Sequence, residues 1–433
     1  MFLTIPNYAA ARFLFCTGLQ NNPPDQLPRE DNASRHCIEM LTPYSQENGG
    51  PLKIEHITYV EGRGNLIITY PGKTDKTVGF VGSHLDVVPA DPETWDFNPF
   101  ELTVDGDKLL GRGTTDCLGH IALVTEFFLQ LAQAKPDLDV TVCAVFIASE
   151  EAASVPKDAG VEGLVEHGRI AHLKNGPIIW VDCADSQPCI GTAGAMQWHL
   201  EVTGKLFHSG LPHKGINSLE LGMEAVAALQ KRFYETYPAH PKETEYNFAT
   251  PSTMKPTQFE CSRNSLNQIP PRCKISGDIR LTPFYDVPQV KAAVEGWVDE
   301  LNQDISQLAT RGPCSKYKLP EDAGGDVGKV ELTWGEHMLA GIACKLDSPG
   351  FHALKDATQE VKGNAVPYSI CGSLPLVREM QQEGFDIQLT GYGLSSTYHA
   401  VNEYAKLTDM QDAIKILARV AHKINAGVKE GSA

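Results

Sequence analysis

The sequence has no long apolar run and little positive charge, and each of these absences excludes a class of protein. None of its 433 residues falls in a stretch that approaches the roughly 20 apolar residues of a membrane-spanning helix. The first residues, Met1–Pro6, lack the basic start and apolar core of a signal peptide. With 37 basic and 54 acidic residues the net charge is −17, which disfavours nucleic acid and anionic membranes as partners. We therefore expect a soluble, cytoplasmic protein.

The spacing of the cysteines matches no disulfide or metal-binding motif. All 11 are spread along the chain without close-set pairs or Cys-x-x-Cys spacing. An odd number of scattered cysteines indicates free thiols in a reducing compartment rather than a disulfide framework. Cys143, for example, lies within an apolar run and is expected to be buried. The chain shows no internal repeat and no low-complexity segment.

The length predicts two domains, each able to bury its own core. Apolar strand-like runs occur at 77–82, 139–148 and 177–182, and a helix is predicted at 119–134 between the first two. This alternation is typical of an α/β fold, with a mainly parallel sheet and helices on both faces. We assign residues 1–192 to this first domain.

From about residue 193 the pattern changes to that of a smaller α+β unit. Its predicted elements are strands at 197–202 and 274–281 and helices at 218–234 and 287–305. A strand-helix-strand-strand-helix order predicts one sheet backed by two helices over residues 193–311. The stretch 312–328 is the predicted return linker, so that residues 312–433 complete the first domain. Thr408–Gln411 predicts a capping box at the start of the last helix.

Histidine and acidic residues follow the ends of the strand-like runs. His84 comes after the first run, Glu150 and Glu151 after the second, and Asp182 after the third. Ligands of open α/β sheets bind beyond the carboxyl ends of the strands, so these side chains are expected to share one site. Asp86 is two residues from His84, on the same face, where its carboxylate can brace the imidazole.

Two features of this set allow more than one interpretation. Asp116 ends the glycine-punctuated loop Gly111–Asp116, and it could bridge two divalent metal ions or simply cap the helix that follows. The adjacent Glu150 and Glu151 could be a solvated surface pair. Alternatively, one glutamate could bind a metal while the other acts as a general base with a raised pKa.

A set of segments together resembles the M20 family of metallopeptidases and deacylases. These segments are Val81–Pro89, Gly111–Asp116, Glu150–Glu151, Gly204–Gly210, Asn267–Pro270, Asp278–Arg280 and Tyr398–Glu403. Within that family, Ala184–Gly191, Ala249–Thr257 and Gly391–Leu394 are most similar to the plant-type acetylornithine deacetylases. The resemblance implies a homodimeric amidohydrolase of arginine biosynthesis with a small-molecule substrate. It would hydrolyse N2-acetyl-L-ornithine to L-ornithine and acetate.

The resemblance also implies a role for each candidate in the first domain. His84 and Asp182 would hold one metal ion, and Glu151 and His399 would hold the other. Asp116 would bridge the two ions, Asp86 would orient His84, and Glu150 would be the general base. Zinc is the expected metal, although histidine and carboxylate ligands also suit cobalt and manganese. Asp185 is an alternative to Asp182, which we prefer because it directly follows a strand.

By the same resemblance, residues 193–311 would form a ferredoxin-like lid and dimerisation domain. His208 would reach the active site of the partner subunit and stabilise the oxyanion. Asn267 and Arg280 would bind substrate, and a guanidinium is well suited to an α-carboxylate. The plainer alternatives are a loop histidine for His208 and a strand-face salt bridge for Arg280.

Other functions compatible with the sequence are a broader N-acyl-amino-acid hydrolase, a desuccinylase or a dipeptidase. A catalytically silent homologue that serves as a binding protein belongs to a different class. The presence of Glu150 and of a full set of candidate ligands argues against the silent homologue.

Overall fold

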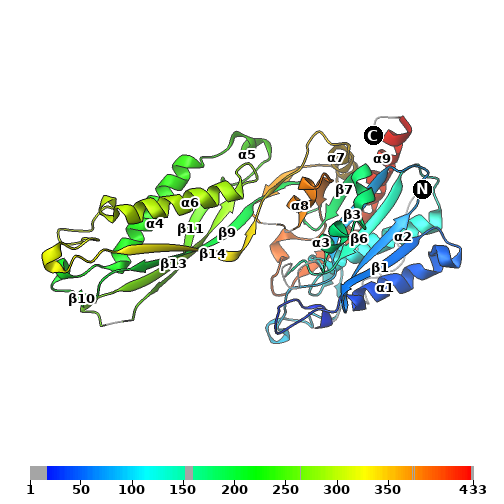
Figure 1. Ribbon diagram of the computed structural model, residues 1–433. Coiled ribbons are helices and arrows are strands. Elements are labelled where there is room, and N and C mark those ends of the chain that lie inside the picture. Colours follow the sequence, from blue (N-terminus) through cyan, green and yellow to red (C-terminus); the bar gives the residue numbers. More distant parts are fainter. Residues whose placement is uncertain (1–16, 152–158, 264, 373, 375, 431–433) are drawn as a thin grey trace. The chain divides into compact units, whose positions relative to one another are not determined.

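The computed structural model describes residues 17–151, 159–263, 265–372, 374 and 376–430, so that the segment Met1–Pro6 lies outside the described residues. Contacts between residues divide the chain into two compact units (Figure 1). Unit 1 consists of Met1–Ile190, Cys344–Tyr368 and Pro375–Ala433, and unit 2 of Gly191–Ala343 and Ser369–Leu374.

Unit 1 is built on a mixed sheet with parallel strands at its centre. The order of its first six strands is β1-β2-β6-β3-β7-β17. The strands are β1 (Lys53–Val60), β2 (Arg63–Tyr70), β3 (Thr77–His84), β6 (Thr141–Ile147), β7 (Pro177–Val181) and β17 (Asp386–Thr390). β3 pairs in parallel with β6 and β7, β17 pairs in parallel with β7, and the β1-β2 hairpin adds antiparallel strands at one side. The predicted runs at 77–82, 139–148 and 177–182 are thus confirmed as central strands.

Helices cover both faces of this sheet. One face packs against α1 (Asp31–Leu41), α2 (Leu118–Ala134), α7 (Pro349–Lys362) and α9 (Leu407–Glu430), which together with Phe80 form one buried cluster. Successive strand residues face opposite sides of a sheet, so Gly79 lies on the side opposite Phe80. A Cβ atom at Gly79 would contact Leu173 of the short helix η6 (Ala171–Asn175), which covers that side. The predicted α/β architecture is therefore confirmed.

The start of α9 differs from the sequence prediction. The helix begins at Leu407, one residue before the predicted capping box. The Thr408 hydroxyl donates to Asp107 Oδ2 at 2.8 Å, and the Thr408 N–H donates to Asp107 Oδ1 at 2.8 Å. The capping box was therefore a wrong prediction, because a carboxylate from the β4-β5 turn (Thr103–Asp105 and Lys108–Leu110) satisfies the helix start instead.

Unit 2 contains an antiparallel sheet with the order β11-β13-β9-β14. Its strands are β9 (Gly194–Thr203), β11 (Thr253–Cys261), β13 (Arg272–Leu281) and β14 (Lys329–Leu339). The helices α4 (Ser218–Thr236) and α6 (Val287–Gln303) pack on the sheet and share its buried cluster, which includes Trp198 and Phe233. One sheet backed by two helices is what the sequence predicted for this region.

The second unit extends further along the chain than residue 311. After the predicted linker 312–328, the chain enters β14, which pairs with β9 along most of its length. The continuous part of unit 2 therefore ends at Ala343. A separate pair of short strands, β10 (Phe207–His208) and β12 (Gln268–Ile269), also belongs to unit 2.

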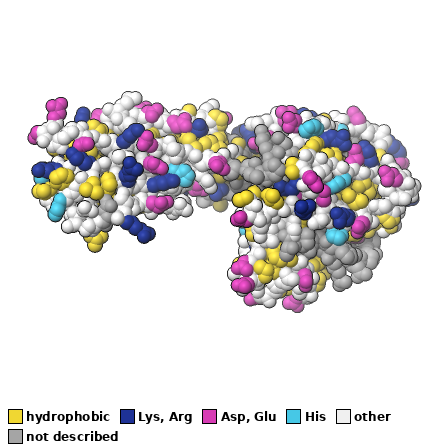
Figure 2. All heavy atoms as spheres, turned by 60° about the horizontal axis from the view of Figure 1, so that its bottom comes forward, with side chains coloured by type: hydrophobic (Ala, Val, Ile, Leu, Met, Phe, Trp, Pro, Cys, Tyr) yellow, Lys and Arg dark blue, Asp and Glu magenta, His cyan; other side chains and the backbone are white. Residues whose placement is uncertain are grey.

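Charged side chains of both signs are mixed on the face drawn in Figure 2. Figure 2 shows lysine and arginine side chains interspersed with aspartate and glutamate on the face it draws. That face lacks the continuous basic stripe that is typical of nucleic-acid binding. Within the described part of the chain, no helix combines the length and the apolar composition required to cross a membrane.

Candidate metal centre

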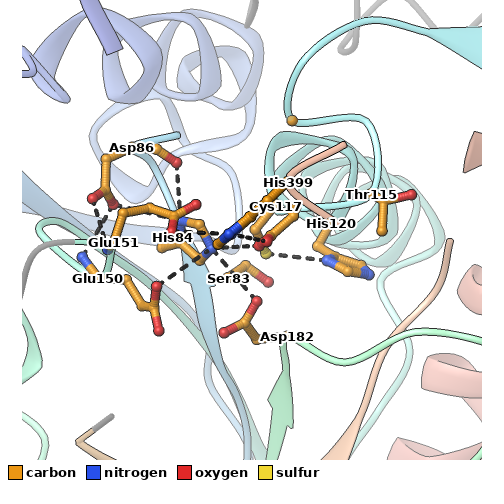
Figure 3. Close-up of polar contacts among 12 residues, drawn as sticks. Ser83, His84, Asp86, Thr115, Cys117, His120, Glu150, Glu151, Asp182 and His399 are labelled. Carbon is orange, nitrogen blue, oxygen red and sulfur yellow. Dashed lines mark hydrogen bonds and ion pairs between the residues drawn. The ribbon is translucent and has the colours of Figure 1, made fainter. Parts of the chain in front are cut away.

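The candidate residues of unit 1 meet where the parallel strands end (Figure 3). His84 is the last residue of β3. Glu150 and Glu151 come shortly after β6, and Asp182 directly follows β7. The loop before α2 brings Asp116, and the segment after β17 brings His399. Adjacent parallel strands place their carboxyl ends at one edge, which explains why residues so far apart in sequence converge.

Asp116 lies between the two imidazoles. Its Oδ1 is 2.9 Å from His84 Nε2, and its Oδ2 is 3.0 Å from His399 Nε2. The helix-capping alternative does not describe this side chain, because the N-cap of α2 is Cys117 and the two oxygens of Asp116 face histidines. One oxygen for each imidazole is the arrangement that a bridging carboxylate needs.

A second carboxylate accompanies each imidazole. Asp182 Oδ1 is 3.5 Å from His84 Nε2, and Glu151 Oε2 is 3.3 Å from His399 Nε2. His84 is thus closest to Asp116 and Asp182, and His399 to Asp116 and Glu151. Glu150 Oε2 lies 3.9 Å from His84 Nε2, at the margin of this group.

Asp185 is outside this cluster. It is exposed, has a backbone φ of 64°, and accepts a hydrogen bond from the Ser395 N–H at 3.0 Å. A left-handed φ is typical of a turn residue, and the carboxylate is occupied by backbone of the segment that follows β17. The geometry of the site thus includes Asp182 and not Asp185.

Asp86 is connected to both the imidazole and the glutamates. His84 Nδ1 donates to the backbone carbonyl of Asp86 at 2.9 Å, with the Asp86 carboxylate at 3.4 Å. This bond uses the Nδ1 proton, so that Nε2, which faces Asp116 Oδ1, is the nitrogen that could bind a cation. The carboxylate itself accepts hydrogen bonds from Asn21 Nδ2 at 2.7 Å and from the N–H groups of Glu150 and Glu151 at 3.1 and 3.0 Å. Asp86 therefore positions the glutamate pair as well as His84.

Glu403 is a site residue to which sequence reasoning assigned no role. It is completely buried and accepts from Arg112 Nη1 at 2.7 Å. Its oxygens also accept from the N–H groups of Gly113, Thr115 and Asp116, at 3.0, 2.8 and 3.0 Å. Glu403 was part of the motif Tyr398–Glu403, but only the structure shows that it holds the loop that carries the bridging carboxylate.

Burial and crowding perturb the carboxyl groups strongly. Burial raises the pKa of Glu150 well above its ordinary value, and neighbouring carboxylates raise it further. Burial and the Asp116 charge raise the pKa of Glu151 to about 7. Hydrogen bonds to Asp116 and Glu151 raise the pKa of His399 to about 10. Perturbed groups of this kind cluster at functional sites.

These residues fit divalent metal ions. One donor atom each from His84, Asp116 and Glu151 lie within 4.8 Å of one another. Among the described residues, buried Glu151 Oε1 has no hydrogen-bond partner. Buried negative charge is costly unless a cation or donors compensate it, and bound ions would compensate it here.

The three candidate residues of unit 2 are His208, Asn267 and Arg280, and each is described by its contacts within that unit. His208 is exposed on β10, and its Nδ1 accepts a hydrogen bond from the Gly210 N–H at 2.9 Å. Asn267 precedes β12, the strand that pairs with β10. Arg280 Nε donates to Asp278 Oδ2 at 2.7 Å on β13, so the strand-face salt bridge considered above is present.

Known proteins are similar to this chain along most of its length. Residues 80–423 match the sequence model of Peptidase family M20/M25/M40. The acetylornithine deacetylase of Arabidopsis thaliana is 54% identical over 408 residues, which cover 94% of this chain and 92% of that protein. The acetylornithine deacetylase of Dictyostelium discoideum is 52% identical over 412 residues, or 93% of this chain and 92% of that protein.

Solved structures share the fold at much lower identity. A dinuclear metal-binding M20 peptidase from Bacillus subtilis superposes with a TM-score of 0.60 at 15% identity. The superposition covers 96% of this chain and 97% of that one.

Proposed function

The chain belongs to Peptidase family M20/M25/M40, and from this premise we propose that it hydrolyses N2-acetyl-L-ornithine to L-ornithine and acetate. The assignment of the substrate rests on one observation. The chain is 54% and 52% identical to two acetylornithine deacetylases over almost its whole length. The convergence of imidazoles and carboxylates around Asp116 supports hydrolysis as the chemistry. The reaction would serve arginine biosynthesis, and a location in the cytoplasm stays a prediction.

The residues of the centre suit two divalent ions, for which we propose zinc. His84 and Asp182 would hold one ion, Glu151 and His399 would hold the other, and Asp116 would contact both. When bound, such ions polarise an amide carbonyl and lower the pKa of water. The backbone carbonyl of Asp86 accepts the Nδ1 proton of His84, so that Nε2 is the nitrogen that would bind an ion.

Glu150 is the proposed proton carrier. Its backbone N–H is bonded to Asp86, which fixes the turn, and its Oε2 lies at the margin of the donor cluster. The raised pKa, caused first by burial, suits a carboxyl that must hold a proton between two steps. Glu150 would take a proton from the attacking water and deliver it to the leaving amine nitrogen.

The roles proposed for unit 2 rest on family membership. His208 would stabilise the oxyanion in the partner subunit of a homodimer, and unit 2 would act as lid and dimerisation domain. Asn267 and Arg280 would contact the substrate, the latter through the guanidinium nitrogens beyond the Nε that bonds Asp278.

A substrate panel tests the proposal. Acetate release from N2-acetyl-L-ornithine is compared with turnover of N-succinyl-diaminopimelate, N-acetylmethionine and a dipeptide, before and after chelation and readdition of zinc or cobalt. We expect metal-restored preference for acetylornithine. Preference for another substrate would reject the assigned substrate, and turnover that is indifferent to chelation would reject the metal chemistry.

A further inference from the structure

A buried thiol lies beside the candidate ligands His84 and Asp182. The donor atoms of His84, Cys117 and Asp182 lie within 4.8 Å of one another, and all three residues are buried. Cys117 directly follows Asp116, so that two potential donors come from one turn at the start of α2. The sequence pointed to no such role, because Cys117 is not part of a cysteine motif.

His120, in the first turn of α2, contacts the sulfur of Cys117. Its Nδ1 lies 3.1 Å from Cys117 Sγ, a contact drawn in Figure 3. Its Nε2 accepts a hydrogen bond from the Tyr392 N–H at 2.7 Å. Since a neutral imidazole carries one proton and Nε2 is the acceptor, the proton is on Nδ1 and points to the sulfur. The sulfur thus receives a hydrogen bond.

The thiol itself donates a weak hydrogen bond to the backbone carbonyl of Val181 at 3.7 Å. Hydrogen bonds from neighbouring groups orient and stabilise metal ligands, and they are a regular part of metal sites. Cys117 is also the N-cap residue of α2, a helix of 17 residues. The approach of the sulfur to donor atoms of His84 and Asp182 is the observation that points to a metal ligand.

We propose that Cys117, as a thiolate, is a further ligand of the ion held by His84 and Asp182, with His120 as its positioning residue. This inference rests on the metal dependence in the proposed function. On binding, the thiol releases its proton to solvent, as metal-binding thiols do. A sulfur ligand favours zinc over manganese, because soft ligands discriminate against hard cations.

Cobalt substitution tests this assignment. The full-length protein is stripped of metal and loaded with Co(II), and its near-ultraviolet absorption is recorded. A thiolate ligand gives a sulfur-to-cobalt charge-transfer band. We expect the band in the unmodified protein and its loss in Cys117→Ser. The matched control is Cys37→Ser, because Cys37 is a buried cysteine whose sulfur also accepts a hydrogen bond, from Thr125 at 3.5 Å. This control should retain the band.

A second measurement uses the unmodified protein and does not depend on whether Cys117→Ser folds. X-ray absorption at the zinc edge should show sulfur at about 2.3 Å in addition to nitrogen and oxygen neighbours. Only nitrogen and oxygen neighbours, or a cobalt band that persists in Cys117→Ser, would overturn the assignment. Metal-dependent deacetylation without sulfur ligation would reject this inference alone, whereas absence of metal-dependent turnover would reject the proposed function.

Discussion

Asp86 and Glu403 are buried carboxylates that act on backbone rather than on substrate. Asp86 accepts from the N–H groups of Glu150 and Glu151, and Glu403 accepts from three N–H groups of the loop that ends at Asp116. Both therefore fix the chain segments that carry the proposed base and ligands. Outer partners of this kind contribute strongly to metal affinity in other proteins.

Glu150→Gln separates proton transfer from metal binding. The amide keeps the shape of the side chain but cannot take up a proton, so kcat for acetylornithine should fall by about 10²–10⁴-fold. Because Glu150 is not a proposed ligand, the metal content measured by mass spectrometry should stay at the native level. A variant that retains a near-native rate would remove Glu150 from the mechanism.

Glu403→Gln tests the support of the Asp116 loop. The substitution removes the charge that pairs with Arg112 and turns one acceptor into a donor facing backbone N–H groups. Metal affinity, measured by competition with a chelator, should weaken by roughly 10–100-fold, as for other supporting groups.

The control for this variant is Glu360→Gln. Glu360 also contacts basic side chains, Arg419 and Lys423, but on the surface, where ion pairs contribute about 1 kcal/mol or less. The Glu360→Gln variant should bind metal with the native affinity. Equal affinities in Glu403→Gln and Glu360→Gln would mean that Glu403 does not support the centre.

At the scale of secondary structure, the sequence predicts elements that bury apolar residues continuously. The central strands β3, β6 and β7 can be predicted from the sequence because both of their faces are buried, which produces short apolar runs. Site residues that follow those runs were predictable for the same reason. Asn21 and Asp107 were not, because their partners Asp86 and Thr408 lie 65 and 301 residues away, and no local pattern encodes such pairings.

Asp107→Ala tests the observed start of α9. Removal of this carboxylate leaves the Thr408 N–H and hydroxyl without their partner, and the free energy of unfolding should fall by about 0.5–2 kcal/mol. Chemical denaturation measures the change. Gln411→Ala serves as the comparison, because Gln411 belongs to the capping box that the sequence predicted. If Gln411→Ala lowers the free energy of unfolding more than Asp107→Ala does, the capping box predicted from the sequence would be favoured over the Asp107 contact.

At the scale of the whole molecule, the proposed catalyst is a homodimer in which His208 acts in the partner subunit. Glu150→Gln and His208→Ala should each be inactive alone. When the two variants are co-expressed, half of the dimers are mixed, and each mixed dimer assembles one intact site from two chains. Activity should then return to about a quarter of the native level, given random pairing in a two-fold dimer.

Two results would contradict action in trans. One is co-expressed variants that remain as inactive as each variant alone while forming mixed dimers, detected with distinct affinity tags. The other is full activity of a strictly monomeric protein in sedimentation. Either result would confine the active site to residues of one chain.

The central claim is that a dinuclear metal centre in unit 1 hydrolyses acetylornithine, and a metal titration of the stripped protein tests it most directly. Zinc or cobalt is added in steps while acetate release from N2-acetyl-L-ornithine and bound metal are followed on the same samples. The account predicts no turnover without metal and full activity at two ions per chain. Full turnover in the stripped protein, or binding of metal without any acetate release, would contradict it.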